Sequence, residues 1–149
     1  MATAKKLAAE VWAAVEAGEV ERLDELFAES VEFSTTAGAG QGRDYVRQLF
    51  IRHRQGYPDL VHEVVDSIES ADGDAVALRL TFRGTHGGEL RGPLGRVAPT
   101  GRSLLWRSSD HVRVRDGKIV SWHAHFDRLT LLDQLGELDR LRRRAPVDA

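Results

Sequence analysis

Four residues that could transfer protons or bind a metal lie close together between positions 106 and 127. Asp110 directly precedes His111, and His123 and His125 occupy alternate positions of the following run. A buried carboxyl group can act as an acid or a base. Imidazoles two positions apart on a strand can instead share a metal ion. The secondary structure of this stretch therefore decides which chemistry is available.

The stretch has the sequence pattern of a β-hairpin. Two runs in which apolar and polar residues alternate flank Asp116-Gly117, a pair that is typical of tight turns. Asp110 belongs to the even-numbered positions, which are mostly apolar, whereas the histidines belong to the odd-numbered, polar positions. Since successive side chains of a strand point to opposite faces, we expect Asp110 to face the interior and the histidines to face outward.

The length of the turn fixes which residues of the two strands lie opposite each other. A two-residue loop of Asp116 and Gly117 would place Asp110 opposite His123. A loop from Arg115 to Gly117, with Gly117 in a left-handed bulge, keeps the even positions of both strands together. We favour this three-residue loop, because the other register would bury the row of histidines and arginines. The expected pairs are Asp110 with Trp122 and Ser108 with Ala124.

An aspartate on such an apolar face, between tryptophans, has unusual acid–base properties. Burial disfavours its charged form and raises its pKa. The group can then protonate or deprotonate a carbon atom next to a carbonyl, or stabilise an enolate oxygen. The structural alternative is an Asp110 that only accepts hydrogen bonds from Ser108 or Tyr45, or pairs with a cation from a helix. Ser108 has no visible base, so we interpret it as orienting the acid.

A metal site is the less favoured interpretation of the histidines. His123, His125 and Asp127 share one strand face, and His111 lies on the neighbouring strand. Arginines occupy the same row and oppose the binding of a cation, so we predict no metal and no other cofactor.

Two further histidines are candidate site residues. His53 falls on the apolar stripe of a predicted helix and could reach a pocket as a second acid or base, or simply form its wall. His86 lies at a strand end, beside a glycine-rich segment, where it could contact a ligand. The glycines there do not form a phosphate-binding loop, because the motif GxxxxGK[ST] and a following helix are missing.

Length and composition indicate one ordinary globular domain. The chain has 149 residues, of which 42% are hydrophobic and 30% charged. A formal net charge of −2 gives no reason to expect nucleic acid or an anionic membrane as a partner. There is no cysteine and hence no disulfide or thiolate chemistry. The N-terminal sequence lacks the pattern of a signal peptide and no segment suits a membrane span, so we predict a cytoplasmic protein.

Hydrophobic periodicity changes from helical in the first third of the chain to alternating after Leu60. The predicted elements are a helix ending at Gly18, a shorter helical piece over 20–27, a strand at 31–36, a flexible loop at 37–43, a helix at 44–55, strands at 61–69 and 75–85, a Gly/Pro-rich connection at 87–102, the hairpin, and a short helix at 131–136 capped by Asp127 or Thr130. The charged tail should add a helical turn and then fray.

Helices followed by antiparallel strands are the order of an α+β fold. We predict a cone-shaped, curved antiparallel sheet that wraps around the N-terminal helices and encloses a hydrophobic pocket.

Several local patterns occur in one order: EAGEVERLDELFAESVEF, GRDYVRQLF, YPDL, GDAVALRLTFRGTHGGEL, PTGR, DHVRVRDGKIVSWHAHFD and LLDQLG. Together they resemble the SnoaL-like branch of the nuclear-transport-factor-two-like superfamily, which includes polyketide cyclases, ketosteroid isomerases and limonene epoxide hydrolases. The resemblance implies one domain over residues 1–136, a charged C-terminal extension over 137–149, and a small hydrophobic ligand. It also implies a homodimer formed through the outer face of the sheet.

The catalytic residues of these relatives are carried over only in part. Asp110 occupies the position of the protonated acid of ketosteroid isomerases. The partner tyrosine of those enzymes would fall near Val11 or Trp12, and their general base near Thr35. The acid/base aspartate of the cyclases and epoxide hydrolases matches Ala124. The charged Arg/Asp pair of the epoxide hydrolases would lie where the chain has Leu78, Leu80 and Phe82.

These patterns favour a cofactor-independent cyclase or isomerase that acts on a hydrophobic carbonyl compound, polyketide-like or terpenoid-like. The alternative is a ligand-binding or accessory module with the same pocket and no turnover. The predicted catalytic residues are Asp110 and His53. The predicted substrate-binding residues are Trp12, Thr35, Tyr45, Phe50, Phe82, Trp106, Ser108, Trp122, Ala124 and Phe126.

Overall fold

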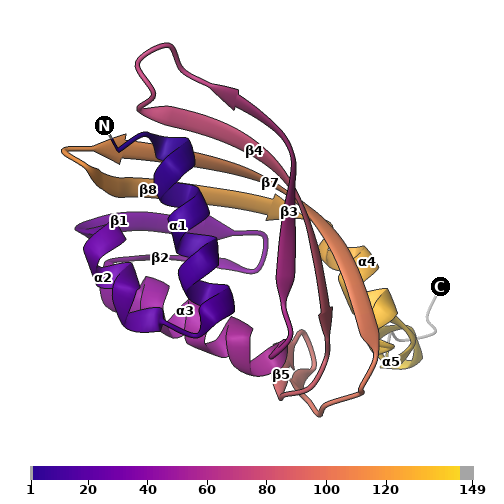
Figure 1. Cartoon of the computed structure of the whole chain (residues 1–149). Coiled ribbons are helices and arrows are strands. Elements are labelled where there is room, and N and C mark those ends of the chain that lie inside the picture. The colour runs from indigo at the N-terminus through magenta and orange to yellow at the C-terminus, as the bar shows by residue number, and fades with distance from the viewer. Residues whose placement is uncertain (1, 145–149) are drawn as a thin grey trace.

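The computed structural model describes residues 2–144, which form an α+β fold. A six-stranded sheet curves around two long helices, α1 (Ala4–Ala17) and α3 (Arg43–Gly56), on its concave side (Figure 1). The predicted fold class is confirmed. The remaining elements are η1 (Val20–Arg22), α2 (Leu23–Leu26), β1 (Phe27–Thr35), β2 (Gly38–Gln41), β3 (Val61–Glu69), β4 (Ala75–Thr85), β5 (Leu90–Gly92), β6 (Gly95–Val97), β7 (Ser103–Arg115), β8 (Lys118–Phe126), α4 (Arg128–Gln134) and α5 (Glu137–Arg144).

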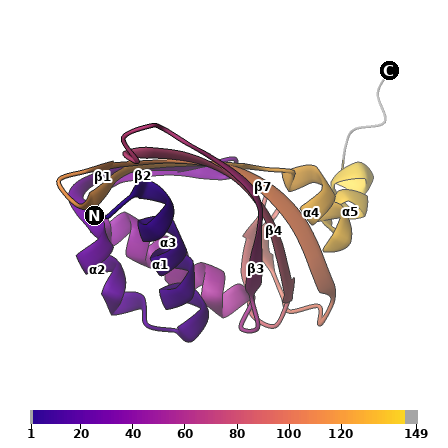
Figure 2. The same ribbon diagram turned by 45° about the horizontal axis from the view of Figure 1, so that its top comes forward.

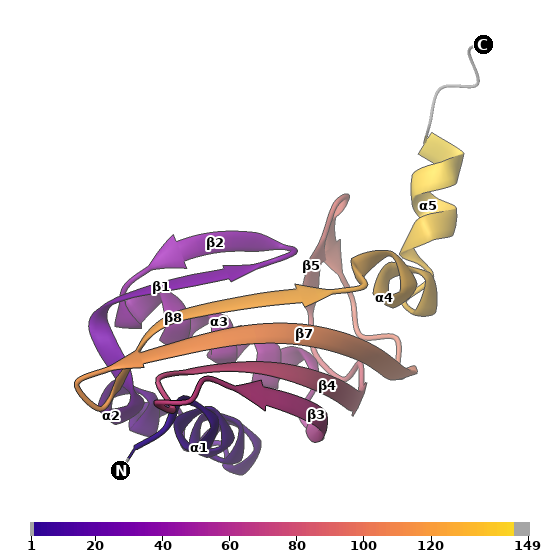
Figure 3. The same ribbon diagram turned by 90° about the horizontal axis from the view of Figure 1, so that it is seen from above.

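The strand order of the main sheet is β2-β1-β8-β7-β4-β3. All neighbours are antiparallel except β1 and β8, which run parallel. Figure 2 shows the bend of the sheet over α1 and α3, and Figure 3 shows the strands side by side with β2 and β3 at the two edges. The first and last strands of the chain are thus adjacent in the middle of the sheet.

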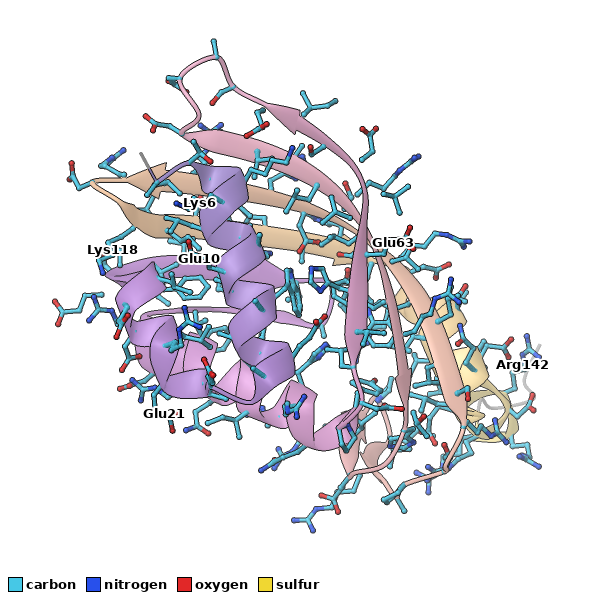
Figure 4. All side chains as sticks on the ribbon, in the orientation of Figure 1. Lys6, Glu10, Glu21, Glu63, Lys118 and Arg142 are labelled. Atoms are coloured by element: carbon cyan, nitrogen blue, oxygen red, sulfur yellow. The ribbon has the colours of Figure 1, made fainter. Side chains whose placement is uncertain are left out.

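The β7–β8 hairpin turns through two residues. Arg115 pairs with Lys118, which leaves only Asp116 and Gly117 in the loop. Both have positive φ angles, 51° and 73°, as the twisted type I′ turn requires. The predicted three-residue loop is therefore wrong. Lys118 also donates a hydrogen bond to the carbonyl of Glu25, which ties this end of the hairpin to α2 (Figure 4).

A bulge in β8 corrects the register that this short turn would impose. The pairing shifts by one residue between the turn and the middle of the hairpin, where Val120 is the extra residue. From Trp122 onward the even positions of both strands share the inner face, as predicted, although for a different reason. Between the turn and the bulge the prediction is wrong, because the buried residue there is Ile119, an odd position. The observed pairs are Asp110 with Ala124 and Ser108 with Phe126, in place of the predicted Asp110 with Trp122 and Ser108 with Ala124.

The N-terminal edge of the sheet also differs from the prediction. β1 begins at Phe27, which the sequence pattern assigned to a helical piece, so the strand is longer than 31–36. The segment predicted as a flexible loop contains β2, which pairs with β1. A β-carbon at Gly40 would lie only 2.3 Å from the ring of Tyr45, so this strand needs glycine where α3 crosses it.

The connection from β4 to β7 contains a second, unpredicted hairpin made of β5 and β6. Its first residues lie against the end of α3: the N–H groups of Gly87 and Gly88 donate to the carbonyl of Gly56 at 3.0 and 3.3 Å. A β-carbon on Gly88 would lie 1.9 Å from the carbonyl oxygen of Gln55. The hairpin is therefore anchored to the helix by backbone contacts that a larger residue would break.

Two short helices complete the chain. Asp127 caps α4, since its carboxylate accepts a hydrogen bond from the backbone N–H of Thr130 at 3.0 Å, and the predicted capping by Asp127 is confirmed. In α5, Glu137 is 2% exposed and accepts a hydrogen bond from Arg140 at 2.6 Å. The predicted fraying of the tail falls on residues 145–149, outside the described residues. Within 2–144, no helix has the length and apolar character to cross a membrane.

The edge strand β3 exposes apolar side chains. Val61, Val64, Val65 and Ile68 are 44–73% exposed. The pairing with β4 shifts between Val64 and Asp66, so this edge is bulged. Glu63 lies on the side of β3 that faces away from the helices (Figure 4). The strand thus combines an apolar surface with a bulge and an acidic side chain.

Candidate functional site

A cavity of about 860 Å³ lies between the helices and the concave face of the sheet. α1, α3, β7, β8 and α4 contribute to its wall, together with the first strands and the β5–β6 hairpin. This volume lies in the range typical of small-molecule sites. The cavity lies on the same face as the alternating row of buried β7 side chains, which includes Trp106, Ser108 and Asp110.

Asp110 is the one carboxylate buried in this wall among the described residues, with an exposed fraction of 1%. Its two oxygens have different partners. The hydroxyl of Ser108 donates to Oδ1, and the indole N–H of Trp122 donates to Oδ2 at 2.8 Å. Trp122 lies diagonally across the hairpin from Asp110, a geometry that the observed register creates.

The surroundings of Asp110 act on its pKa in opposite directions. Burial has the largest effect and raises the pKa, whereas the hydrogen bonds from Ser108 and Trp122 lower it, and the net shift is upward. The site therefore favours a proton on Asp110 more than water does, while two donors still stabilise the anion. A group balanced in this way can both release and accept a proton.

His53 lines the same cavity from α3. Burial lowers its pKa to about 4, so the imidazole is neutral near pH 7. Its Nε2 atom is buried and has no hydrogen-bond partner in residues 2–144. The ring lies 5.9 Å from that of Trp106 and 5.3 Å from that of Tyr57, measured between centroids.

Aromatic rings form most of the remaining wall. Trp122 stacks on Phe33 with a centroid distance of 5.9 Å, and Phe82 stacks on Trp106 at 5.4 Å. Trp12 joins the two pairs, since its ring is 4.7 Å from Phe82 and 6.1 Å from Trp122. Such a wall suits a flat, hydrophobic ligand.

The structure brings together the predicted catalytic and substrate-binding residues, whereas His86, a further candidate, does not line the cavity. Lining the cavity are the two catalytic candidates, Asp110 and His53, and the substrate-binding candidates Trp12, Thr35, Tyr45, Phe50, Phe82, Trp106, Ser108, Trp122, Ala124 and Phe126. Their roles remain predictions, because lining a cavity does not assign a function.

Several lining residues escaped the sequence analysis. Tyr57, which directly follows α3, was not among the predicted site residues, although an aromatic residue directly after an apolar helix stripe was a usable signal. The β5–β6 hairpin contributes Leu90, Arg91 and Val97, and α4 contributes Leu131, among others. Nothing in the Gly/Pro-rich connection indicated that it would fold back over the cavity.

The other histidines lie away from the cavity. His111 and His123 pair with each other on the outer face of the hairpin, and Nδ1 of His123 is 2.6 Å from the hydroxyl of Ser34. Within residues 2–144, no group of three or more histidines and carboxylates is placed to hold a metal ion. His86 is buried behind the wall, where its Nδ1 accepts a hydrogen bond from the backbone N–H of Thr100 at 3.2 Å.

The raised pKa of Asp110 predicts a pH-dependent effect on stability. Between the pKa of the unfolded chain, 3.8, and the higher folded value, the folded state binds more protons, so stability falls as pH rises. In Asp110→Asn this loss is absent. We expect the variant to gain about 1.4 kcal/mol over the wild type per unit of pKa shift at pH 7, and no such gain below pH 3.8. Urea unfolding at a series of pH values measures the difference, and a gain that is equal at all pH values would contradict the prediction.

The model of the SnoaL-like polyketide cyclase family matches residues 2–135. The chain belongs to this family. Among solved structures, IdmH from Streptomyces antibioticus, a proposed polyketide cyclase, is 32% identical with a TM-score of 0.73, covering 89% of this chain and 97% of that one. AclR from Streptomyces galilaeus, a proposed hydroxylase, is 28% identical with a TM-score of 0.74, covering 89% and 95%. A search of curated proteins gave no match.

Proposed function

We propose that this protein is a cofactor-independent cyclase or isomerase that acts on a hydrophobic carbonyl compound, polyketide-like or terpenoid-like, with Asp110 as its acid/base. The observation that carries the proposal is a single buried carboxyl group, held by Ser108 and Trp122 in the wall of a large aromatic cavity. Membership of the SnoaL-like family and the similarity to IdmH support a ring-forming reaction.

The proposed chemistry needs only this chain and the substrate. The Asp110 carboxylate accepts a proton from the carbon next to a carbonyl, and the electron pair of the broken C–H bond forms an enolate. In a cyclisation, that carbon bonds to a second carbonyl carbon of the same molecule, and the resulting alkoxide takes the proton back from Asp110. In an isomerisation, the proton returns to another carbon of the same enolate. The aromatic wall orients the chain for either outcome.

A second candidate is a ligand-binding or accessory module without turnover. Two features favour it: both oxygens of Asp110 already accept hydrogen bonds, and Ala124 stands where the cyclases and epoxide hydrolases that the sequence resembles carry their acid/base aspartate. In this case Asp110 fixes the orientation of Trp122, and the cavity stores or presents a ligand.

The convex face of the sheet offers a surface for a second copy of the chain. The row of arginines and histidines on the convex face of β7 and β8 is free to form an interface, which is compatible with the homodimer that the family resemblance implies. Neither nucleic acid nor membrane is expected as a partner, because the net charge of −2 offers no attraction to either.

The direct test of the proposed function is the exchange of carbon-bound protons. Purified protein is incubated in deuterated buffer with 2-tetralone, a bicyclic aromatic ketone, and loss of the proton signals next to the carbonyl is followed by NMR. We expect exchange faster than in buffer and faster than with heat-denatured protein. If native and denatured protein give equal rates for 2-tetralone and for an open-chain aryl diketone, the binding module is the better description.

A further inference from the structure

We infer that the cavity has a second polar end, formed by Tyr57, His53 and Trp12, which binds an oxygen atom of the ligand at a distance from Asp110. This inference rests on the proposed function and deepens it, because it defines the substrate as an elongated compound with an oxygen function near each end.

The first observation concerns the hydroxyl of Tyr57. The side chain is 4% exposed and lines the cavity. Its hydroxyl makes no hydrogen bond within residues 2–144, yet it is not among the polar atoms that are sealed from water. Since the side chain is otherwise buried, the hydroxyl must reach the open space of the cavity. It is a free donor and acceptor beside the aromatic rings of His53 and Trp106.

Two nitrogen atoms on other rings of the wall are also unpaired. Nε1 of Trp12 and Nε2 of His53 are buried without a partner in the described part of the chain. The ring of His53 is 5.3 Å from that of Tyr57 and 6.3 Å from that of Trp12. Buried polar groups without a partner destabilise a protein, and they gather where a ligand supplies the missing bond. The open hydroxyl of Tyr57 is therefore the group that a ligand oxygen meets, and the rings that line the same cavity hold two further unpaired polar atoms.

The backbone holds Tyr57 firmly in place. Its N–H donates to the carbonyl of His53 at 3.0 Å, and its own carbonyl accepts from Leu60 at 3.1 Å. Its ring packs on Trp106 with a centroid distance of 5.0 Å. The polar end is thus fixed before any ligand arrives, as a specific site requires.

The position of Trp106 gives the distance between the two polar ends. Trp106 and Asp110 lie four residues apart on the inner face of β7, which corresponds to about 13 Å along a strand. Tyr57 and His53 both contact Trp106, so they lie on the order of 10 Å from Asp110. A linear molecule of about three fused six-membered rings spans such a distance.

At neutral pH neither His53 nor Tyr57 carries a charge. Burial lowers the pKa of His53 to about 4 and raises the pKa of Tyr57 to about 12, so the imidazole is neutral and the phenol keeps its proton. A neutral ligand oxygen, as in a carbonyl or a phenol, is the matching group.

Two related compounds test this inference without any turnover. The first, 2,6-dihydroxyanthraquinone, has a hydroxyl group at each end, and the second, anthraquinone, has the same rings without them. We expect the wild type to bind the dihydroxy compound more tightly, as measured by quenching of tryptophan fluorescence. Tyr57→Phe should lower that affinity by about tenfold and leave the affinity for anthraquinone unchanged. Because the hydroxyl has no hydrogen bond in residues 2–144, its loss should also leave the melting temperature unchanged.

Thr81→Val is the matched control, since it removes a hydroxyl from β4 outside the lining of the cavity and should affect neither compound. The inference is overturned if Tyr57→Phe weakens both compounds equally, if it changes neither, or if the wild type binds neither. A Tyr57-dependent preference for the dihydroxy compound, together with no proton exchange on any ketone, would refute the proposed function and support the second polar end.

Discussion

Asp110→Asn is expected to slow proton exchange on a bound ketone by about 10²- to 10⁴-fold, the range found for loss of a general acid or base. The amide cannot take up a proton at neutral pH, yet it has the shape of the carboxyl group. Its oxygen can still accept the hydrogen bond from Trp122, and its N–H can donate to the hydroxyl of Ser108. The variant should therefore fold and bind ligand as the wild type does, and lose only the chemistry.

The control for this substitution is Asp127→Asn. Asp127 is an exposed cap of α4, and asparagine caps a helix as well as aspartate does, so its rate of exchange should equal that of the wild type. Exchange by Asp110→Asn at the wild-type rate would show that Asp110 is structural. If Asp110→Asn loses both ligand binding and proton exchange, the carboxyl group is needed to form the cavity itself.

Trp122→Ala is expected to lower the free energy of unfolding by about 3–5 kcal/mol, the usual cost of removing a fully buried aromatic side chain. Trp122 is 0% exposed and contacts the rings of Trp12, Phe27 and Phe33. Its loss opens a cavity between sheet and helices, and it also removes the donor that holds one oxygen of Asp110. Urea unfolding followed by circular dichroism measures the change.

Two further variants serve as comparisons for this loss of stability. Trp122→Phe keeps one aromatic ring but removes the N–H, so it leaves a smaller void than alanine and should cost about 1–3 kcal/mol, which includes the bond to Asp110. Ile68→Ala removes a side chain that is 73% exposed on β3 and should change stability by less than about 0.5 kcal/mol. A Trp122→Ala protein as stable as the Ile68→Ala protein would contradict the packing described for the centre of the sheet.

The inner face of the hairpin could be predicted because it depends only on alternation. The even positions of β7 are buried from Leu104 to Val114 without interruption, and Asp110 follows them inward. The same reasoning marked aromatic residues for the cavity, since in a sheet wrapped around helices the core and the cavity share one surface. Where one face of a strand is buried, a short sequence pattern suffices to predict which side chains point toward the core.

The register could not be predicted, because two local features act together. The turn at Asp116 and Gly117 is the short one that its sequence favours, and a bulge at Val120 then restores the pairing of even positions. No residue type marks such a bulge. β2 and the β5–β6 hairpin were missed for another reason: their glycines permit close approach to Tyr45 and Gln55, contacts that only the folded chain reveals.

The parallel pairing of β1 with β8 has a consequence for how the chain folds. Ser34 and His123, hydrogen-bonded across this pair, are 89 positions apart in sequence. During synthesis the β1–β2 hairpin therefore emerges long before its main neighbour, whereas β7 and β8 can pair as soon as their turn is complete. Joining the first strand to the last closes the longest loop in the sheet and should set the folding rate. Until residue 135 has left the ribosome, the chain has no finished cavity and hence no site for a ligand to stabilise.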